Sequence, residues 1–304
     1  MIKLSIITIN YNNADGLRNT LASVAAQTYR DIEHVIVDAA STDGSVNIIK
    51  EYAEKADYPV QWISEKDKGV YAGMNKGIEI ALGRRVVNAL NRSELVEDKN
   101  IGIQRATGDY IQILNSGDIL ASSNVTERMV AALPEGVSIF YGNMLKSYDG
   151  KKIINRDTCG SGMYTPESFL YFYNGTLNHD CAYIRRDLFD KYGLYNEDMK
   201  ICSDWEWYVK AIVLGEEKPV YINIDVTIFD MNGVSESHGK NAELIKKERR
   251  EYLEKILPST VLHDYDTFSF LVFQYQRLKK HHLWGLVYFM ERVLFKLEKW
   301  HILK

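Results

Sequence analysis

Residues 110–118 read Tyr-Ile-Gln-Ile-Leu-Asn-Ser-Gly-Asp, and the functional interpretation of the chain starts from the aspartate at the end of this stretch. Its first five residues are mostly apolar, as in a buried β-strand, and its last is an aspartate just beyond the carboxyl end of that strand. Open α/β sheets bind their ligands in the crevice outside such strand ends. A carboxylate there can hold Mg²⁺ against a diphosphate, although an aspartate at a strand end is more often a turn former or helix cap. The interpretation of Asp118 as a metal ligand therefore depends on finding polar residues at other strand ends.

Strand-like and helix-like patterns alternate along the first half of the chain, which predicts an α/β fold with a mostly parallel sheet and flanking helices. Strands are expected at 3–9, 32–38, 60–64, 110–114 and 137–141, with helices at 14–26, after 44 and near 124–133. The second half predicts a hairpin turn at 148–151, an extended segment at 181–184, a helix at 205–214, a strand at 220–229 and a helix at 241–256. The C-terminal segment has the pattern of one or two amphipathic helices.

The composition is that of an ordinary soluble protein, because 46% of the 304 residues are hydrophobic and 26% are charged. A net charge of −4 gives no reason to expect a nucleic acid partner. The chain enters a strand-like run at its first residues without the shape of a signal peptide, and its three cysteines have no metal-type spacing. No uncharged stretch reaches the ~18 residues of a membrane helix. We therefore expect a cytoplasmic protein with reduced cysteines.

Polar side chains follow three of the predicted strands and are expected at one edge of the sheet. The strand at 3–9 leads to Thr8, Asn10 and Tyr11, that at 32–38 to Asp38 and Ser41, and that at 110–114 to Asn115, Ser116 and Asp118. A pyrimidine base presents an N–H and carbonyl groups, so Asp38 can accept from it while Tyr11 stacks on its face. Asp118 is then placed to bind a cation that also contacts the diphosphate. For Asp43, in contrast, capping of the following helix is the favoured interpretation.

Four motifs together resemble family 2 glycosyltransferases of the GT-A fold, a Rossmann-like architecture. They are Thr8-Ile9-Asn10-Tyr11-Asn12, Val37-Asp38-Ala39-Ala40-Ser41-Thr42-Asp43-Gly44-Ser45, Asp67-Lys68-Gly69-Val70-Tyr71 and Asn115-Ser116-Gly117-Asp118. The resemblance covers most of residues 1–235. It implies an inverting transfer of a sugar from a nucleotide diphosphate donor, with a UDP-sugar favoured and Mn²⁺ or Mg²⁺ as cofactor. It assigns the metal to Asp118 and contacts with the donor to Thr8, Asn10, Tyr11, Asp38, Ser41, Asp67, Lys68, Asn115 and Ser116.

The second half supplies a candidate general base in Ser203-Asp204-Trp205-Glu206, where the aspartate stands just before a predicted helix. The resemblance assigns this position to the carboxylate that deprotonates the acceptor hydroxyl. A carboxylate within hydrogen-bond reach of a hydroxyl can accept its proton as the new bond forms. Asp204 could also be a helix N-cap, and the two roles do not exclude each other. The resemblance places His179, Asp180 and Trp205 on the acceptor side.

Three features depart from the family pattern. Gly117 stands where a second acidic residue is common, which leaves Asp118 as the direct carboxylate ligand of a metal. Ala72 stands where an acidic residue is expected, and loss of that carboxylate could lower activity or alter the acceptor. The segment 78–102 is an apparent insertion, since the family would pass almost directly from Ile78 to Gln104. We interpret it as a surface excursion rather than a lid beside the donor site.

We expect a glycosyltransferase domain at 1–238 and a helical extension at 239–304. Between Arg277 and Lys304 there are seven Lys or Arg and two Glu, and apolar residues fall on one helical stripe. A basic amphipathic helix with tryptophans can lie in a membrane interface, but such a stripe more often packs on its own domain or on a second subunit. Packing or homodimerisation through 265–304 is therefore preferred over peripheral contact with the inner face of the membrane.

The resemblance implies a saccharide or lipid-linked acceptor, in the assembly of bacterial surface polysaccharides. Two alternatives stay open. A degenerate homologue would bind a nucleotide sugar without turnover, which Ala72 and Gly117 favour and which Asp118 and Asp204 oppose. A nucleotidyltransferase shares the sheet and the metal-held phosphates, but it normally has a glycine-rich basic loop after its first strand, which the residues at 10–13 do not form.

Overall fold

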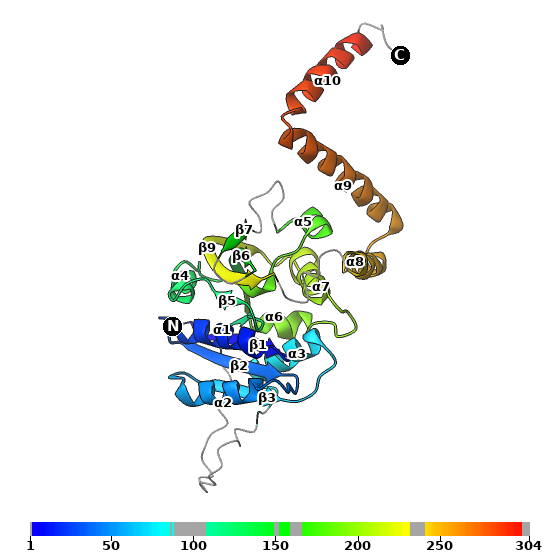
Figure 1. Cartoon of the computed structure of the whole chain (residues 1–304). Helices are drawn as coiled ribbons and strands as arrows, with labels where there is room; N and C mark the ends of the chain where they lie inside the picture. Colours follow the sequence, from blue (N-terminus) through cyan, green and yellow to red (C-terminus); the bar gives the residue numbers. More distant parts are fainter. Residues whose placement is uncertain are drawn as a thin grey trace. The chain divides into compact units, whose positions relative to one another are not determined.

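The computed structural model describes residues 2–85, 87, 108–148, 152–158, 166–231 and 241–299 (Figure 1). The chain divides into two compact units, Met1–Arg249 and Arg250–Lys304. The first unit contains the β-sheet, and the second consists of helices. The predicted domain boundary after residue 238 falls outside the described residues and stays a prediction.

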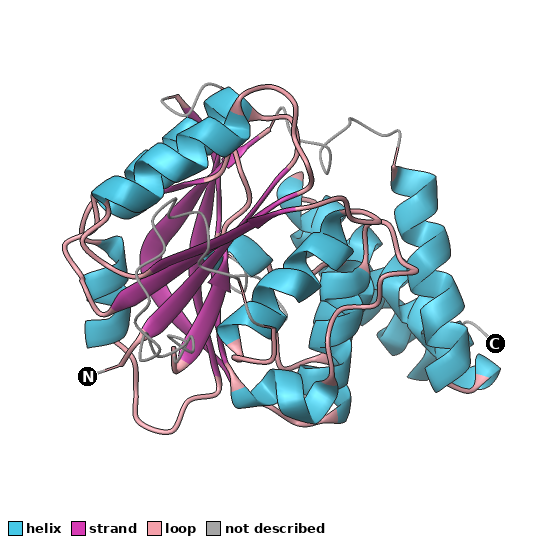
Figure 2. Cartoon of the chain, turned by 90° about the horizontal axis from the view of Figure 1, so that it is seen from below, coloured by secondary structure: helices cyan, strands magenta, loops and turns pink. Residues whose placement is uncertain are grey.

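One sheet of nine strands forms the centre of the first unit, in the order β3-β2-β1-β4-β8-β6-β9-β5, with β7 paired to β6. Four neighbouring strands are parallel: β3 (Val60–Ser64), β2 (Ile32–Asp38), β1 (Leu4–Asn10) and β4 (Tyr110–Ile113). The others are β8 (Ala182–Arg185), β6 (Ile139–Ser147), β9 (Pro219–Asp230), β5 (Ile119–Leu120) and β7 (Ile153–Asp157). Figure 2 shows this twisted sheet with helices on both of its faces.

Helices connect the strands and complete the chain. In the first part they are α1 (Ala14–Ala25), α2 (Ser45–Lys55), α3 (Val70–Ala81) and α4 (Val125–Ala131). Shorter helical segments follow: α5 (Phe169–Asn174), the 3₁₀ turn η1 (His179–Cys181), α6 (Asp187–Tyr192), α7 (Ser203–Tyr208) and the π-helical η2 (Val209–Leu214). The last three are α8 (Ala242–Ile256), α9 (Ser259–Lys280) and α10 (Trp284–Lys299).

The predicted α/β class is confirmed, but the sheet is less parallel than expected. Among the described strands, β8 runs antiparallel to both β4 and β6, and β5 and β7 also pair antiparallel with their neighbours. Parallel pairing outside the first four strands is limited to β6 with β9. Parallel strands need a long crossover connection, whereas β7 follows β6 closely in the sequence and can pair with it antiparallel.

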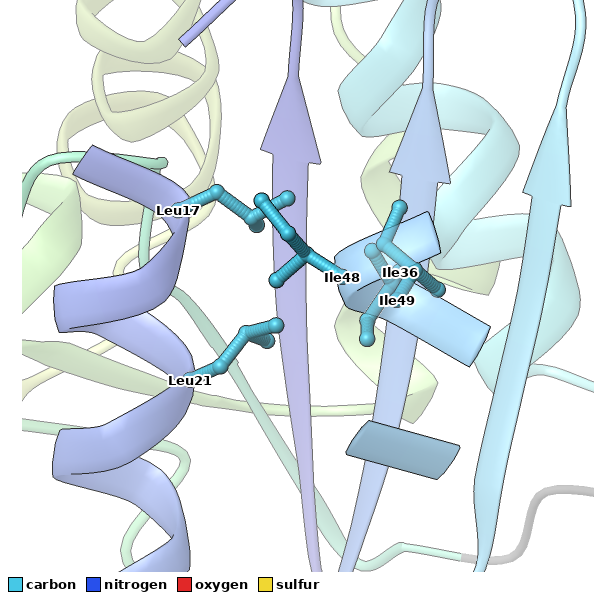
Figure 3. Close-up of a cluster of buried hydrophobic side chains, with 5 residues drawn as sticks. All are labelled: Leu17, Leu21, Ile36, Ile48 and Ile49. Atoms are coloured by element: carbon cyan, nitrogen blue, oxygen red, sulfur yellow. The ribbon is translucent and has the colours of Figure 1, made fainter. Parts of the chain in front are cut away.

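The core of the parallel half is a set of aliphatic side chains between α1, α2 and β2. Figure 3 shows Leu17 and Leu21 of α1 facing Ile48 and Ile49 of α2, with Ile36 of β2 beside them. All seven residues of β2 are buried, as expected for a central strand covered on both faces. This packing fixes the position of the strand ends that carry the candidate site.

On the opposite face α3 packs closely against β1. A Cβ atom on Gly77 would lie 2.3 Å from Cγ2 of Ile7, so only glycine fits this crossing. At Gly73, one turn earlier, a Cβ would contact Ile9 at 3.5 Å. The close approach brings the first turn of α3 over the carboxyl end of β1.

Several local predictions can be compared with the structure. The helix predicted at 205–214 is present as α7 followed by the π-helical η2, so its second half is wound more widely than an α-helix. The hairpin predicted around 148–151 joins two antiparallel strands, β6 and β7, but residues 149–151 lie outside the described ranges. The proposed insertion begins inside α3, and most of it, from residue 88 onward, is also outside them.

The second unit contains α9 and α10. The rings of Tyr275 and Trp284 meet edge to face, with centroids 4.2 Å apart, where the two helices join. No helix within the described ranges is both long and apolar enough to cross a membrane.

Candidate active site

The ends of β1 and β2 form a closed hydrogen-bond cluster around Asp38. Its buried carboxylate accepts from Nδ2 of Asn10 at 2.8 Å, from the backbone N–H of Ser41 at 2.9 Å and from the hydroxyl of Ser64 at 2.6 Å. The hydroxyl oxygen of Ser41 in turn accepts from the backbone N–H of Asn12 at 2.8 Å. Because one carboxylate collects three donors, the cluster holds the loops after β1, β2 and β3 together.

Beside this cluster one polar atom lacks a partner and one ring is exposed. The amide oxygen of Asn10 is buried and has no hydrogen-bond partner among the described residues. The ring of Tyr11 is 66% exposed. A nucleobase can stack on such a ring.

The ends of β1 and β4 are also tied together. The backbone N–H of Ser116 donates to the carbonyl of Ile9 at 3.0 Å, and the carbonyl of Ser116 accepts from Nδ2 of Asn13 at 3.0 Å. Asn13 also caps α1 by accepting from the backbone N–H of Gly16 at 3.2 Å. Ser116 therefore contributes backbone contacts that bring the first and fourth motifs to one edge of the sheet.

A cavity of about 280 Å³ lies beside the connection from β3 to α3. Asp67, Lys68 and Ala72 line it. The carboxylate of Asp67 accepts from the backbone N–H of Gly69 at 3.1 Å, which orients it at the start of α3. The methyl group of Ala72 leaves open the volume that a carboxylate at this position would fill.

Asp118 lies beyond the carboxyl end of β4, in a turn that α1 holds. Gly117 has a φ of +109°, which favours glycine, and its N–H donates to Oγ1 of Thr20 at 2.9 Å. The side chain of Asp118 is buried, and its Oδ1 accepts from the backbone N–H of Asp230 at 3.0 Å. Burial, and after it the charge of Asp180, raises the pKa of Asp118 well above its usual range.

Asp204 forms an ion pair with His179. Oδ2 of Asp204 is 3.2 Å from Nδ1 of His179, and Oδ1 accepts from the hydroxyl of Tyr71 in α3 at 3.0 Å. Burial alone would raise the pKa of Asp204, but the hydrogen bond and charge of His179 outweigh it and lower that pKa. Burial likewise opposes a charge on His179, but Asp204 raises the pKa of the imidazole to about 9. At neutral pH both side chains are therefore charged.

Asn115 links this ion pair to the segment that carries Asp118. Its Nδ2 is 3.1 Å from Nε2 of His179, while its buried Oδ1 has no partner within the described part of the chain. An imidazolium carries an N–H on both ring nitrogens and cannot accept from an amide N–H. With the amide oxygen and nitrogen of Asn115 exchanged, Oδ1 accepts from the N–H on Nε2 of His179. His179 then donates to Asn115 on one side and to Asp204 on the other.

Comparisons with known proteins agree with the motifs. The family described as Glycosyl transferase family 2 matches residues 5–91. An uncharacterized glycosyltransferase of Mycobacterium tuberculosis is 28% identical over 250 residues, which are 81% of this chain and 82% of the relative. A PGL/p-HBAD biosynthesis glycosyltransferase of Mycobacterium bovis is 24% identical over 260 residues, which are 85% of each chain. The predicted resemblance to family 2 glycosyltransferases is confirmed.

Solved glycosyltransferase structures share the fold of this chain. S. aureus TarS 1-349 in complex with UDP-GlcNAc has a TM-score of 0.61 and 17% identity, over 84% of this chain and 67% of that chain. A longer TarS chain is matched over 37% of its length. The mannosyltransferase PcManGT from Pyrobaculum calidifontis, in complex with GDP-Man and Mn²⁺, has a TM-score of 0.54 and 16% identity, over 81% of this chain and 61% of that chain. The architecture is the GT-A fold of these proteins.

The structure separates Thr8 from the other predicted donor residues. Its side chain is fully buried in the sheet, and its hydroxyl is 2.9 Å from Nε2 of His34. Burial also lowers the pKa of His34 to about 3, so this imidazole is neutral. The Thr8 hydroxyl is thus already engaged, which argues against a contact with the donor. Asp43 has the expected capping role, because it accepts from the backbone N–H of Ser45 and from that of Ala14.

Two residues expected on the acceptor side are instead enclosed in the protein. Trp205 is 1% exposed, and its indole N–H donates to the carbonyl of Phe172 at 2.7 Å. Asp180 is 2% exposed and accepts from the hydroxyl of Thr227 at 2.8 Å. Both side chains support the site from inside, because aromatic packing and a buried hydrogen bond already occupy them. Only His179 of the three reaches the candidate base.

A divalent cation fits the surroundings of Asp118. The like charges of Asp180 and Asp230 act on this buried carboxylate, and a cation would relieve their repulsion. Asp230 also occupies the space beside Gly117, since its Oδ2 would lie 3.5 Å from a Cβ at that position. A second carboxylate is therefore present, although residue 117 does not supply it. No group of three or more His, Cys, Asp or Glu is arranged to hold a metal within the described ranges.

Sequence reasoning missed Asp230 and Tyr71 as members of the site. Asp230 ends β9 as Asp118 follows β4, so an aspartate after a strand-like run was a usable signal. Tyr71 stands inside a quoted motif, but its contact with Asp204 spans 133 positions in the sequence. No local pattern predicts such a contact.

Proposed function

We propose that this glycosyltransferase moves a sugar from a nucleotide diphosphate sugar, with a UDP-sugar favoured, to a hydroxyl group of an acceptor with inversion at the anomeric carbon. One observation carries the proposal: Asn115, His179 and Asp204 form a hydrogen-bonded chain from the segment of Asp118 to a charged, partly accessible carboxylate. This series of hydrogen bonds supports the proposal that the donor-binding residues and the general base belong to one site.

Asp204 has the properties of the base. Its lowered pKa keeps the carboxylate ready to accept a proton at neutral pH, and its two hydrogen bonds fix its direction. In the proposed step the acceptor oxygen forms a bond to the anomeric carbon, and the bond from that carbon to the diphosphate oxygen breaks. The hydroxyl proton passes to Asp204, and the electron pair of the broken bond leaves with the nucleotide diphosphate. A single displacement of this kind inverts the configuration.

The strand ends support the donor side of the proposal. The exposed ring of Tyr11 suits a pyrimidine base, which can stack on it. Asp38 and Ser41 act by holding this edge together, since their side chains bind one another and the neighbouring loops. Asp67 and Lys68 line the adjacent cavity, where the polar parts of a nucleoside can bind.

Mn²⁺ or Mg²⁺ is the proposed cofactor. Asp118 would hold it, with Asp230, the donor phosphates and water completing the coordination. The cation would offset the negative charge that develops on the leaving diphosphate.

A lipid-linked or saccharide acceptor is proposed at the inner face of the membrane, and α10 supports this setting. None of its residues is buried, and Leu286, Phe289, Met290 and Val293 are exposed at helical spacing. Arg292, Lys296 and Lys299 form a second stripe along the same helix. An apolar stripe beside a basic stripe suits an anionic lipid surface, whereas a second copy would bring a helix of the same charge.

Vesicle binding separates membrane contact from dimerisation through 265–304. The full chain should sediment with phosphatidylglycerol vesicles but not with phosphatidylcholine vesicles, and Val293→Asp should abolish the binding. A chain that binds neither vesicle and scatters light as a stable dimer would contradict membrane contact.

A panel of nucleotide sugars tests the activity itself. Release of nucleotide is measured with Mn²⁺, Mg²⁺ or a chelator, with and without saccharide and lipid-linked acceptors. Acceptor-dependent release that stops on chelation is expected. Binding of a donor without release for any acceptor would favour the degenerate homologue, and failure to bind any donor would refute the transferase proposal.

A further inference from the structure

Glu248 is a buried carboxylate that binds the loop directly before the candidate base. Its Oε1 accepts from the backbone N–H of Lys200 at 2.7 Å, and its Oε2 accepts from those of Ile201 and Cys202 at 3.1 and 3.0 Å. The side chain of this α8 residue is 7% exposed. One carboxylate therefore collects three consecutive backbone donors, which fixes the direction of the loop.

This loop sets the position of Asp204. It leads into α7, in which Asp204 is the second residue. The carbonyl of Ile201 accepts from the hydroxyl of Tyr71 at 2.5 Å, and the same hydroxyl contacts Oδ1 of Asp204. A shift of the loop would thus move both the backbone before Asp204 and the tyrosine that orients its carboxylate.

Two further contacts hold the start of α8 against the same segment. The guanidinium of Arg249 lies 5.1 Å from the ring centroid of Trp205, the neighbour of Asp204. The thiol of Cys202 is 3.8 Å from the carbonyl of Ile245. Glu248 is therefore in a packed setting rather than at the end of a mobile side chain.

We propose that Glu248 is a positioning residue for the general base. The inference rests on the proposed role of Asp204, and it extends the functional part of the chain beyond the predicted boundary after residue 238. A neutral amide at position 248 would lose one of the two accepting oxygens and present an N–H to the donors of the loop. At least one buried N–H would then lack an acceptor, and the loop would move. A displacement of about 1 Å can lower turnover about 100-fold.

The test compares Glu248→Gln with Glu243→Gln in the full chain. Glu243 is exposed on the same helix, so its substitution makes the same change in charge without touching the loop. Amide hydrogen exchange of a peptide covering residues 199–204 reports the loop without any substrate. Donor affinity is measured by calorimetry, and turnover by nucleotide release.

For Glu248→Gln we expect faster exchange in the 199–204 peptide, an unchanged donor affinity and a kcat lowered about 10-fold to 100-fold. Glu243→Gln should match the unchanged protein in all three measurements. Unchanged exchange would refute the contact with the loop, whatever the enzyme does. Faster exchange with an unchanged kcat would refute the positioning role, whereas a wild-type chain without turnover would refute the proposed function instead.

A milder variant keeps the test decisive if Glu248→Gln does not fold. Glu248→Asp retains the charge but shortens the side chain by one methylene, so partial loss of turnover with intact donor affinity is expected. Loss of donor affinity in proportion to turnover would overturn the proposal.

Discussion

The unit that contains the β-sheet has two groups of contacts centred on aspartates, one around Asp38 and one around Asp118 and Asp204. They differ in how far hydrogen bonds and opposite charges compensate the carboxylates. Around Asp38, three donors occupy both carboxylate oxygens. Around Asp118, burial and neighbouring carboxylates oppose the charged form and raise the pKa, whereas the charge of Asp204 is balanced by that of His179. A saturated carboxylate stabilises structure, whereas an incompletely satisfied one is suited to bind a cation or accept a proton.

In both groups an aspartate at the boundary of a strand or helix collects hydrogen-bond donors. Asp38 and Asp118 each stand where a strand ends, and Asp204 stands in the first turn of α7, so each carboxylate marks an element boundary in the sequence. What separates them is the set of donors that the fold brings near: loop N–H and hydroxyl groups for Asp38, and the imidazole of His179 and the hydroxyl of Tyr71 for Asp204. We expect substitutions in the first group to affect stability and those in the second to affect catalysis.

The largest expected effect comes from Asp204→Asn. An amide cannot take the proton of the acceptor hydroxyl, so kcat should fall about 1000-fold while donor affinity is retained. Steady-state nucleotide release and calorimetry with the donor measure the two quantities. Asp198→Asn, an exposed aspartate six positions earlier, is the control. Joint loss of donor binding and transfer would show that Asp204 is not the base.

Asp38→Ala should act on stability instead. It removes the acceptor of Asn10, Ser41 and Ser64, and buried donors without an acceptor cost about 3 kcal/mol of unfolding free energy. Urea unfolding measures this change, with Asp198→Ala expected to differ from the wild type by less than about 0.5 kcal/mol. A stable Asp38→Ala protein that has lost only donor binding would reverse the contrast between the two groups.

His34 predicts how stability in the first group depends on pH. Burial lowers the pKa of His34 to about 3, against 6.5 for an exposed imidazole, so the unfolded chain binds the extra proton first as the pH falls. Stability is therefore complete above pH 6.5 and falls by about 1.4 kcal/mol per pH unit as the pH drops toward 3. Urea unfolding between pH 7 and pH 5 tests this slope. His34→Gln should flatten it, and an equal slope in both proteins would contradict the assignment.

His179→Ala should produce the smallest effect, a change in the pH profile of turnover. Without the imidazolium, burial acts unopposed by that charge and the pKa of Asp204 rises. The acidic limb of kcat should therefore move to higher pH. Nucleotide release from pH 3 to pH 8 measures the shift. A profile that only scales down, without moving, would exclude His179 as the group that tunes the base.

Much of the fold could be predicted from the sequence because its signals are local. The apolar run of β2 and the helical spacing of α1 require no distant information, and their bounds differ little from the predicted ones. The antiparallel partners of β8 were not predictable in the same way. Four-residue strands carry little periodicity, and their neighbours are chosen by the packing of the whole sheet.

The residues of the candidate site show the same difference between local sequence signals and tertiary packing. Asp118, Asp38 and Asp204 stand next to strand or helix boundaries, so their motifs indicated them directly. Trp205 and Asp180 were expected beside a substrate, yet packing encloses both. Burial of a side chain depends on every element around it, which no single motif records.

The sequence by itself determined the α/β class and the motifs that carry the carboxylates, because strand periodicity and strand-end residues are properties of neighbouring positions. Only the tertiary structure decided which carboxylate is saturated, which is paired with His179, and which loop Glu248 holds. Those outcomes depend on distances between side chains that are far apart in the chain. The strength of a charge interaction depends on that distance and on the exclusion of water, and folding alone fixes both.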